Sequence, residues 1–117
     1  MNEADLKSTV GDYLSYGQNQ GKWYFERLNS GEAFVKKGGK YYKIQLCREG
    51  TADFMVLKNN GRYDAPNKFF CLPIFLELKS ERGKTTKAQD EFAEAVRNQG
   101  ASYFIVKSIE KLQEILS

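Results

Sequence analysis

A glutamate and a lysine stand two positions apart at the end of the most apolar stretch of the sequence, FFCLPIFLELK at 69–79. Alternate side chains of a β-strand point to the same face, so Glu77 and Lys79 would share a face, about 6 to 7 Å apart along the strand. Leu76 and Leu78 would point the opposite way, into the core. Two charged groups at the end of an apolar strand cost free energy when they are buried without a partner. We therefore expect them where the sheet opens toward solvent, a ligand or a metal ion.

A second acidic residue, Asp53, opens another apolar run at 54–57. If that run forms the strand beside Glu77, the two carboxylates can share one cation, and Mg²⁺ prefers such oxygen ligands. The backbone carbonyl of Leu78 could supply a further ligand. A metal ion placed there would neutralise a phosphodiester and lower the pKa of a water molecule. Lys79 would then stabilise the transition state or act on the attacking water, so the pattern indicates phosphodiester hydrolysis.

Other interpretations of these residues compete. Glu77 and Lys79 could form an ordinary charge pair facing solvent at the end of a strand. Asp64 is a rival metal ligand, but it lies among turn-forming residues with no apolar strand directly after it. A similar triplet at 5–7, Asp-Leu-Lys, falls in a predicted helix, where residues i and i+2 do not share a face. We therefore favour Asp53, Glu77 and Lys79.

The composition narrows the chemistry further. The chain of 117 residues contains no histidine, which excludes Ser-His and Cys-His nucleophiles, histidine-bound zinc and histidine general bases. Its length is typical of one domain, so we expect residues 1–117 to form a single unit. The 18 basic and 15 acidic residues give a net charge of +3, which is compatible with a nucleic-acid partner but not diagnostic of one.

The cellular setting follows from what the sequence lacks. No apolar run approaches the ~20 residues that span a bilayer, and the start MNEADLK lacks the layout of a secretion signal. We expect a cytoplasmic protein with no membrane partner and no organic cofactor. Cys47 and Cys71 are expected to be buried reduced thiols, with one disulfide as the alternative.

Hydrophobic periodicity predicts an α/β domain with a central mixed β-sheet flanked by helices, in the order α-β-β-β-β-α-β-α. The predicted helices lie at 2–16, 86–98 and 108–116. The predicted strands lie at 23–28, 54–57, 74–79 and 103–106, with a hairpin over 33–47 that turns at 37–40. The predicted interruptions are a break at 17–21, a turn at 59–61, a loop at 62–68, a strand restart or bulge at Pro73 and a polar loop at 80–84.

The predicted helices have recognisable caps and apolar faces, and Ser108 is expected to cap the last one. Asn2 is expected to cap the first helix, whose apolar residues are Leu6, Val10, Tyr13 and Leu14. Thr86 and Gln89 form a capping box at the start of the second helix, whose apolar residues are Ala88, Phe92, Ala95 and Val96. Gln89 can serve as a cap, as an active-site residue, or as both.

Basic and aromatic residues offer possible contacts to a nucleic acid. Arg82, Lys84 and Lys87 surround the loop after Lys79, where a phosphate backbone would also meet the positive end of the next helix. The alternative for these three is an ordinary solvated loop. The same groove could be lined by Arg27, Lys36, Lys37 and Lys40, whose face the sequence does not settle. The aromatic residues that could stack on bases, build a dimer interface or pack in the core are Trp23, Tyr24, Tyr41 and Tyr42.

Asp53 followed by Glu77-x-Lys79 resembles the PD-(D/E)xK nuclease superfamily. The segments GTADF at 50–54 and FLELK at 75–79, followed by Gln89, are similar to the virus-type replication-repair nuclease (VRR-NUC) domain, over residues 1–110. Ala52 departs from the pattern, because proline is commoner before the aspartate. Pro73 and the loop at 62–68 are also atypical.

The resemblance implies a restriction-endonuclease-like fold and a DNA endonuclease dependent on Mg²⁺ or Mn²⁺. Relatives of this kind act in DNA repair in phages and bacteria, are related to Holliday-junction resolvases and often work as homodimers. Carried over by position, Asp53 and Glu77 would be metal ligands and Lys79 the catalytic lysine. Gln89 would support the site, and Glu3 matches an acidic position near the metal. Branched or four-way-junction DNA is expected as the substrate on the resemblance alone.

Two other functions remain open at this point. The first is a non-catalytic nucleic-acid-binding module with a degenerate nuclease fold, which would keep the basic groove but not the metal ion. The second is a nuclease with the same catalytic residues that acts on RNA. Metal-dependent cleavage assays on DNA and RNA separate these functions from a DNA endonuclease.

Overall fold

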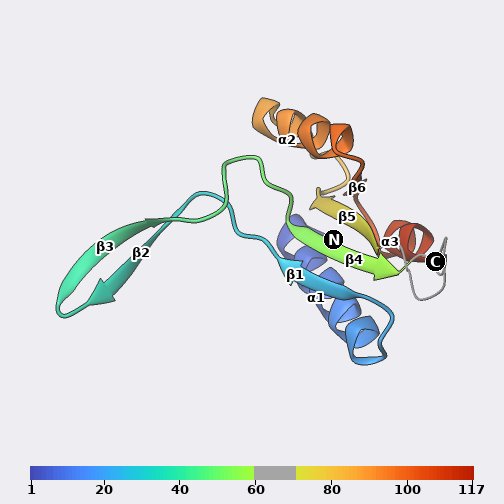
Figure 1. Ribbon diagram of the computed structural model, residues 1–117, viewed down its shortest axis with the longest axis horizontal. Coiled ribbons are helices and arrows are strands. Elements are labelled where there is room, and N and C mark those ends of the chain that lie inside the picture. Colours follow the sequence, from blue (N-terminus) through green and yellow to red (C-terminus); the bar gives the residue numbers. More distant parts are fainter. Residues whose placement is uncertain (60–70) are drawn as a thin grey trace.

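A four-stranded mixed sheet with helices on both faces forms the body of the protein (Figure 1), which confirms the predicted α/β class. The computed structural model describes residues 1–59 and 71–117. Its elements in chain order are α1 (Glu3–Asn19), β1 (Tyr24–Arg27), β2 (Glu32–Lys37), β3 (Lys40–Gln45), β4 (Phe54–Asn59), β5 (Cys71–Leu78), α2 (Lys87–Asn98), β6 (Ser102–Val106) and α3 (Ile109–Leu116). In the described part of the chain, five strands precede α2 where the predicted order had four, because the hairpin contributes two.

The strand register brings the two acidic residues to the same end of the sheet. The strand order is β1-β4-β5-β6, in which β4 pairs antiparallel with both β1 and β5, and β5 pairs parallel with β6. The last paired residues of β4 and β5 at this end are Phe54 and Leu76. One step further along each strand, Asp53 lies opposite Glu77. The start of β4 and the end of β5 therefore meet where the sequence predicts the site.

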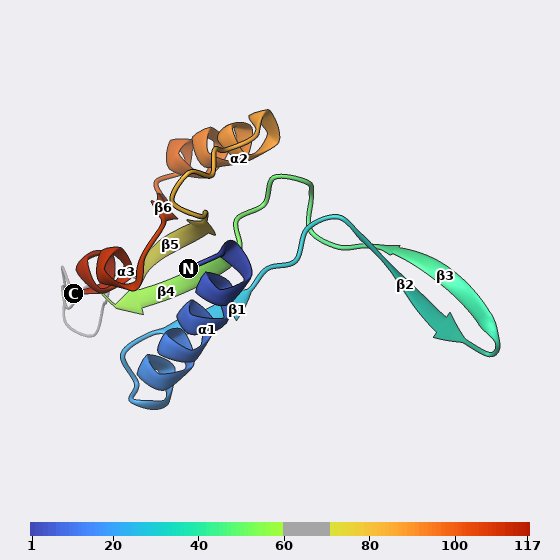
Figure 2. The same ribbon diagram turned by 180° about the vertical axis from the view of Figure 1, so that it is seen from behind.

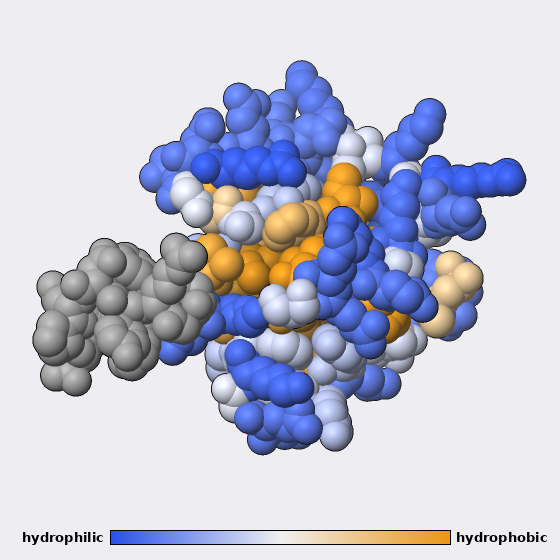
Figure 3. All heavy atoms as spheres, turned by 90° about the vertical axis from the view of Figure 1, so that its right-hand side faces the viewer, coloured by the Kyte–Doolittle hydropathy of each residue, from blue (hydrophilic) through white to orange (hydrophobic). Residues whose placement is uncertain are grey.

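The two faces of the sheet pack against different helices (Figure 2). The core on the side of α1 and α3 contains Leu6, Val10, Leu14, Phe54, Val56, Ile74, Leu76, Leu78, Val106, Leu112 and Leu116. The smaller core on the side of α2 contains Ala52, Phe75, Phe92, Ala93, Val96 and Tyr103. Figure 3 shows the molecule from the side, where apolar surface lies between hydrophilic surface above and below it. Leu76 and Leu78 face the first core, as the strand alternation predicts, so Glu77 faces the α2 side.

Helix α1 runs three residues past its predicted end at 16. Asn2 caps it as expected, since its side chain accepts a hydrogen bond from the Asp5 N–H. Gly17 was expected to begin a break, but it is a buried residue of the helix, and the Trp23 ring packs directly on it. The Trp23 Nε1–H donates to the Leu14 carbonyl at 2.8 Å. Gly17 therefore serves close packing, which local sequence signals do not reveal.

Strand β5 runs through Pro73 without the predicted interruption. Pro73 pairs with Leu57 on one side, while the pairing with β6 begins only at Ile74. Because β6 starts beyond Pro73, the missing N–H costs no ladder hydrogen bond on that side.

The packing of α2 and the cysteines also differs from expectation. On α2 the buried alanine is Ala93, whereas Ala95 is exposed. Cys71 is exposed, Cys47 is half-buried, and both are free thiols, so the prediction of buried thiols was wrong. Trp23 is buried, but Tyr24, Tyr41 and Tyr42 are exposed. The predicted loop at 62–68, with Asp64, lies outside the described residues, as does most of the predicted turn at 59–61. Among the described helices, none is long and apolar enough to cross a membrane.

Strands β2 and β3 form a hairpin that projects from the body (Figures 1 and 2). The strands pair antiparallel, and Lys37 lies opposite Lys40 across the turn, as the sequence predicts. Gly38 and Gly39 adopt φ values of +59° and +79°, which suit a two-residue turn that requires positive φ at both positions.

The contact between Gly17 and Trp23 makes a testable prediction. A Cβ atom at Gly17 would lie 1.9 Å from a Trp23 ring carbon, so Gly17→Ala should lower the free energy of unfolding by about 1 to 3 kcal/mol through overpacking. A Cβ atom at Gly11 would lie 3.9 Å from Phe54, an ordinary contact. The matched variant Gly11→Ala should therefore raise the free energy of unfolding by about 0.5 to 1 kcal/mol. Urea denaturation measures both values, and equal effects would contradict the packing.

Candidate active site

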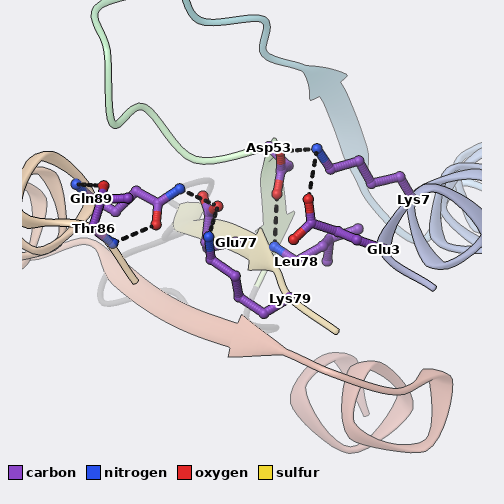
Figure 4. A network of polar contacts seen from close by, with 8 residues as sticks. All are labelled: Glu3, Lys7, Asp53, Glu77, Leu78, Lys79, Thr86 and Gln89. Atoms are coloured by element: carbon purple, nitrogen blue, oxygen red, sulfur yellow. Dashed lines mark hydrogen bonds and ion pairs between the residues drawn. The ribbon is translucent and has the colours of Figure 1, made fainter. Parts of the chain in front are cut away.

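Asp53 sits at the junction of the sheet and α1 (Figure 4). Its Oδ2 accepts a hydrogen bond of 2.7 Å from the Leu78 N–H at the end of β5. Its Oδ1 lies 3.2 Å from the Lys7 Nζ, which reaches over from α1. Lys7 in turn lies 3.6 Å from the Glu3 Oε2. The Asp53 carboxylate is therefore fixed from two sides, and Glu3 joins the same cluster through Lys7.

Glu77 is the second carboxylate of the cluster, and it is only 3% exposed. Its Oε1 accepts a hydrogen bond of 3.0 Å from the Gln89 Nε2 and lies 3.9 Å from the Lys79 Nζ. Its Oε2 is buried and has no hydrogen-bond partner among the described residues. An unpaired carboxylate oxygen in a buried position carries a large desolvation cost.

The pKa values of the cluster reflect this burial. Desolvation, followed by the negative charge of Asp53, raises the pKa of Glu77 from 4.5 to about 7, although Lys79 and Lys7 pull it down. Burial lowers the pKa of Lys7, but the carboxylates of Asp53 and Glu3 outweigh that effect and raise it above its ordinary value. Lys7 therefore stays protonated beside Asp53, while Glu77 can gain or lose a proton near neutral pH.

Gln89 forms the predicted cap of α2 and also contacts Glu77. Its backbone N–H donates to the Thr86 Oγ1 at 3.2 Å, and its Oε1 accepts from the Thr86 N–H at 2.9 Å, which completes the capping box. The Nε2 of the same amide points the other way, toward Glu77. The cap thus orients the amide that holds Glu77.

The other predicted site residues lie around this cluster. Leu78 points its N–H at Asp53, and a strand residue directs its N–H and C=O to the same side, so its carbonyl also faces Asp53. Arg27, at the end of β1, lines a cavity of about 380 Å³ with Glu3 and Lys7. Arg82, Lys84 and Lys87 are exposed and lie on the loop after Lys79 and the first turn of α2.

The oxygen donors of the cluster suit a hard cation. Asp53, Glu77 and the Leu78 carbonyl offer oxygen ligands, and Mg²⁺ in proteins often uses only one or two carboxylates plus water. The unpartnered Oε2 of Glu77 is an available ligand atom. Across residues 1–59 and 71–117, no three acidic or cysteine side chains form a preassembled metal group. The residues present therefore fit a lightly coordinated Mg²⁺ rather than a metal held by protein atoms alone.

Three residues near the site were given no role in it by the sequence analysis. Lys7 was set aside with the triplet at 5–7, although its spacing of four from Glu3 places both on one helix face. Gly50, with φ +90°, allows the loop before Asp53 to approach α2, since a Cβ atom there would lie 2.4 Å from the Ala88 carbonyl. Tyr103 on β6 faces the α2 side, and its buried hydroxyl has no hydrogen-bond partner within the described segments. Burial, followed by the charge of Glu77, raises the pKa of Tyr103 to about 12.

Comparisons of the chain with protein-family models, with curated proteins and with solved structures found no match.

The burial of Glu77 predicts how stability depends on pH in EDTA. The folded state binds a proton at Glu77 more tightly than the unfolded state, so the free energy of unfolding should fall as pH rises from about 4.5 to about 7. A shift of this size corresponds to about 3 kcal/mol. Glu77→Gln should remove this component, making the variant more stable than the wild type at pH 8 and no more stable at pH 4.5.

The matched control is Glu114→Gln, because the Glu114 side chain is 74% exposed. Urea denaturation between pH 4.5 and 8 should show the wild-type slope for this variant. An unchanged slope in Glu77→Gln would contradict the assignment of the titration to Glu77.

Proposed function

We propose that this protein is a divalent-metal-dependent endonuclease that hydrolyses the phosphodiester bonds of DNA. The observation that carries the proposal is Glu77. Its carboxylate is buried at the end of an apolar strand, held at one oxygen by Gln89 and Lys79 and left unpaired at the other. Burying a carboxylate with one unpaired oxygen costs folding free energy and gives a purely structural protein nothing in return. A bound cation would pair with that oxygen and offset its charge.

Charge balance also favours a cation. The cluster contains three carboxylates, Glu3, Asp53 and Glu77, and two ammonium groups, Lys7 and Lys79. One negative charge is left over when all five groups are ionised. Asp53, Glu77 and the Leu78 carbonyl are the groups that would hold Mg²⁺ or Mn²⁺, with Glu3 close by. When bound, the ion supplies Lewis-acid neutralisation of the scissile phosphate.

The remaining residues have roles that follow from their contacts. Lys79, whose side chain is 12% exposed, would place a positive charge where the phosphate gains negative charge in the transition state. Gln89 fixes the Glu77 Oε1 and is itself held by the Thr86 cap, so it is a positioning residue. Arg27, Arg82, Lys84 and Lys87 would contact the phosphate backbone on either side of the site.

The proposal extends to the substrate and the assembly. Branched DNA such as a four-way junction, and a homodimer that cuts two strands symmetrically, are the forms suggested by the resemblance to VRR-NUC domains. A metal-dependent cleavage panel over linear, nicked, flapped and four-way-junction DNA, with Mg²⁺, Mn²⁺ or EDTA, tests the activity and its substrate together. The same panel on RNA tests the RNA-directed alternative.

One observation favours the non-catalytic alternative. Lys7 already neutralises Asp53 in the cluster, and the Leu78 N–H occupies its other oxygen. A nucleic-acid-binding module would leave these contacts in place permanently. DNA binding by the wild type with no cleavage in any metal would support this alternative and overturn the nuclease.

Lys79 provides the first mutational test. Lys79→Met keeps most of the aliphatic stem but removes the charge, so folding should persist while the cleavage rate falls by about 10² to 10³. The matched control is Lys58→Met at the far end of β4, where the Lys58 Nζ donates to the Leu116 carbonyl. That variant should cut at the wild-type rate. Normal cleavage by Lys79→Met, with circular dichroism confirming the fold of both variants, would refute the role of Lys79.

Asp53 provides the second mutational test. Asp53→Asn keeps the shape of the side chain and an oxygen that can accept from the Leu78 N–H, but it removes the negative charge. Mn²⁺ affinity measured by calorimetric titration should fall by about tenfold or more, the magnitude of one lost charged contact. Asp12→Asn, an equal charge change on α1 away from the cluster, should leave the affinity unchanged. Equal Mn²⁺ affinity in wild type and Asp53→Asn would remove Asp53 from the ligand set.

A further inference from the structure

The hairpin of β2 and β3 is exposed on both of its faces. Every residue of these strands is exposed except Ala33, which is half-buried. Neither strand packs on any other helix or strand that the structure describes. A two-stranded hairpin alone in water is only marginally stable, so an arm of this kind gains from a binding partner.

The hairpin carries a charge that is out of proportion to its size. Residues 32–45 contain four lysines and one glutamate, a net charge of +3, which equals the net charge of the whole chain. The remaining residues contain 14 basic and 14 acidic side chains and are neutral overall. The net positive charge of the chain therefore equals that of the arm.

The placement of these lysines leaves most of their charge uncompensated. The Lys43 Nζ lies 3.1 Å from the Glu32 Oε1 and is paired with it. Lys37 and Lys40, in contrast, lie directly opposite each other across the tip. Like charges directly opposite in a hairpin are destabilising. The Lys36 Nζ lies 5.7 Å from the centre of the exposed Tyr41 ring. A polyanion at the tip would relieve the repulsion between Lys37 and Lys40.

We propose that the β2–β3 hairpin is an arm that enters the major groove of a DNA duplex and contacts its phosphates through Lys36, Lys37 and Lys40. The major groove, about 12 Å wide, admits a two-stranded β-ribbon. Six residues per strand give a ribbon about 20 Å long. The deep, narrow major groove of an RNA duplex does not admit side chains in this way, so the shape favours DNA.

A second copy of the chain is a less favourable binding partner for the arm than DNA. Pairing two such arms would bring two charges of +3 together, which opposes association. The exposed Phe34, Val35 and Tyr42 beside the lysines can instead contact sugars and bases, as apolar and aromatic side chains do in nucleic-acid interfaces.

The base of the arm adjoins the candidate active site. Backbone hydrogen bonds continue the ribbon below the strands to Asn29, whose carbonyl accepts from the Cys47 N–H. The next residue, Leu28, donates its N–H to the Asp53 carbonyl at 2.8 Å. The tip lysines lie about one ribbon length, ~20 Å, beyond this base, so a bound duplex would have to extend back along the arm to reach the cluster. This part of the inference rests on the proposed nuclease function.

The test measures DNA affinity in EDTA, where no cleavage occurs, so that it succeeds or fails independently of the nuclease. Lys40→Glu reverses one tip charge and turns the Lys37–Lys40 pair into an attractive one, so the hairpin itself is not weakened. Fluorescence anisotropy with a labelled DNA duplex should show about tenfold weaker binding, with a salt dependence reduced by about one phosphate contact. The control Lys22→Glu makes the same charge change at an exposed lysine after α1 and should bind within twofold of wild type, because a lysine outside the interface releases no counterions.

Three results would overturn the proposal. The first is wild-type affinity in Lys40→Glu, or equal losses in Lys40→Glu and Lys22→Glu. The second is an equal loss for Lys40→Glu on an RNA duplex, which would exclude entry into a DNA major groove. The third is a dimer in sedimentation velocity that Tyr42→Ser dissociates while Lys40→Glu keeps its DNA affinity, since the arm would then join two copies. Loss of binding in Lys40→Glu from a wild type that does not cut DNA would support the arm and refute only the nuclease.

Discussion

The burial of one carboxylate governs the organisation of this protein. Glu77 is the only charged residue classed as buried among those that the structure describes, and a buried carboxylate must be paired, hydrogen-bonded or protonated to be tolerated. Gln89 and Lys79 satisfy one oxygen, and the raised pKa shows that this compensation is incomplete. The Oε2 atom has no hydrogen-bond partner among the described residues, so either a proton or the proposed cation would offset the charge of this carboxylate.

A chain of local interactions holds the Glu77 carboxylate in place. Thr86 caps α2, the capping box orients the Gln89 amide, and that amide fixes Glu77. Gly50 removes the side chain that would otherwise keep the loop before Asp53 away from α2. Glu77 and Gln89 therefore enter the cluster from the α2 side of the sheet, while Lys7 and Glu3 enter it from α1. The cluster forms at an end of the sheet that residues from both helical layers reach.

The sequence predicts those parts of the site that depend on strand periodicity and capping. The alternation around Glu77, the strand context of Asp53 and the double role of Gln89 all follow from local patterns. Lys7, Gly50 and Tyr103 could not be assigned in the same way, because each depends on a contact between distant elements. Lys7 was dismissed by an argument about its partner within the triplet, yet its contact is with Asp53, 46 positions away. Tertiary neighbours, rather than helical spacing, decide which charged residues of a helix reach a site.

The separation of charge between the arm and the cluster has a mechanistic consequence. The arm carries the net positive charge of the chain, whereas the cluster of Glu3, Lys7, Asp53, Glu77 and Lys79 has one excess negative charge when ionised. A phosphate is therefore attracted to the arm but repelled from the metal-free cluster. A divalent cation would reverse the sign of the cluster and remove that repulsion. In the proposed nuclease, DNA binding would then depend mainly on the arm and on salt, whereas cutting would depend on the metal ion.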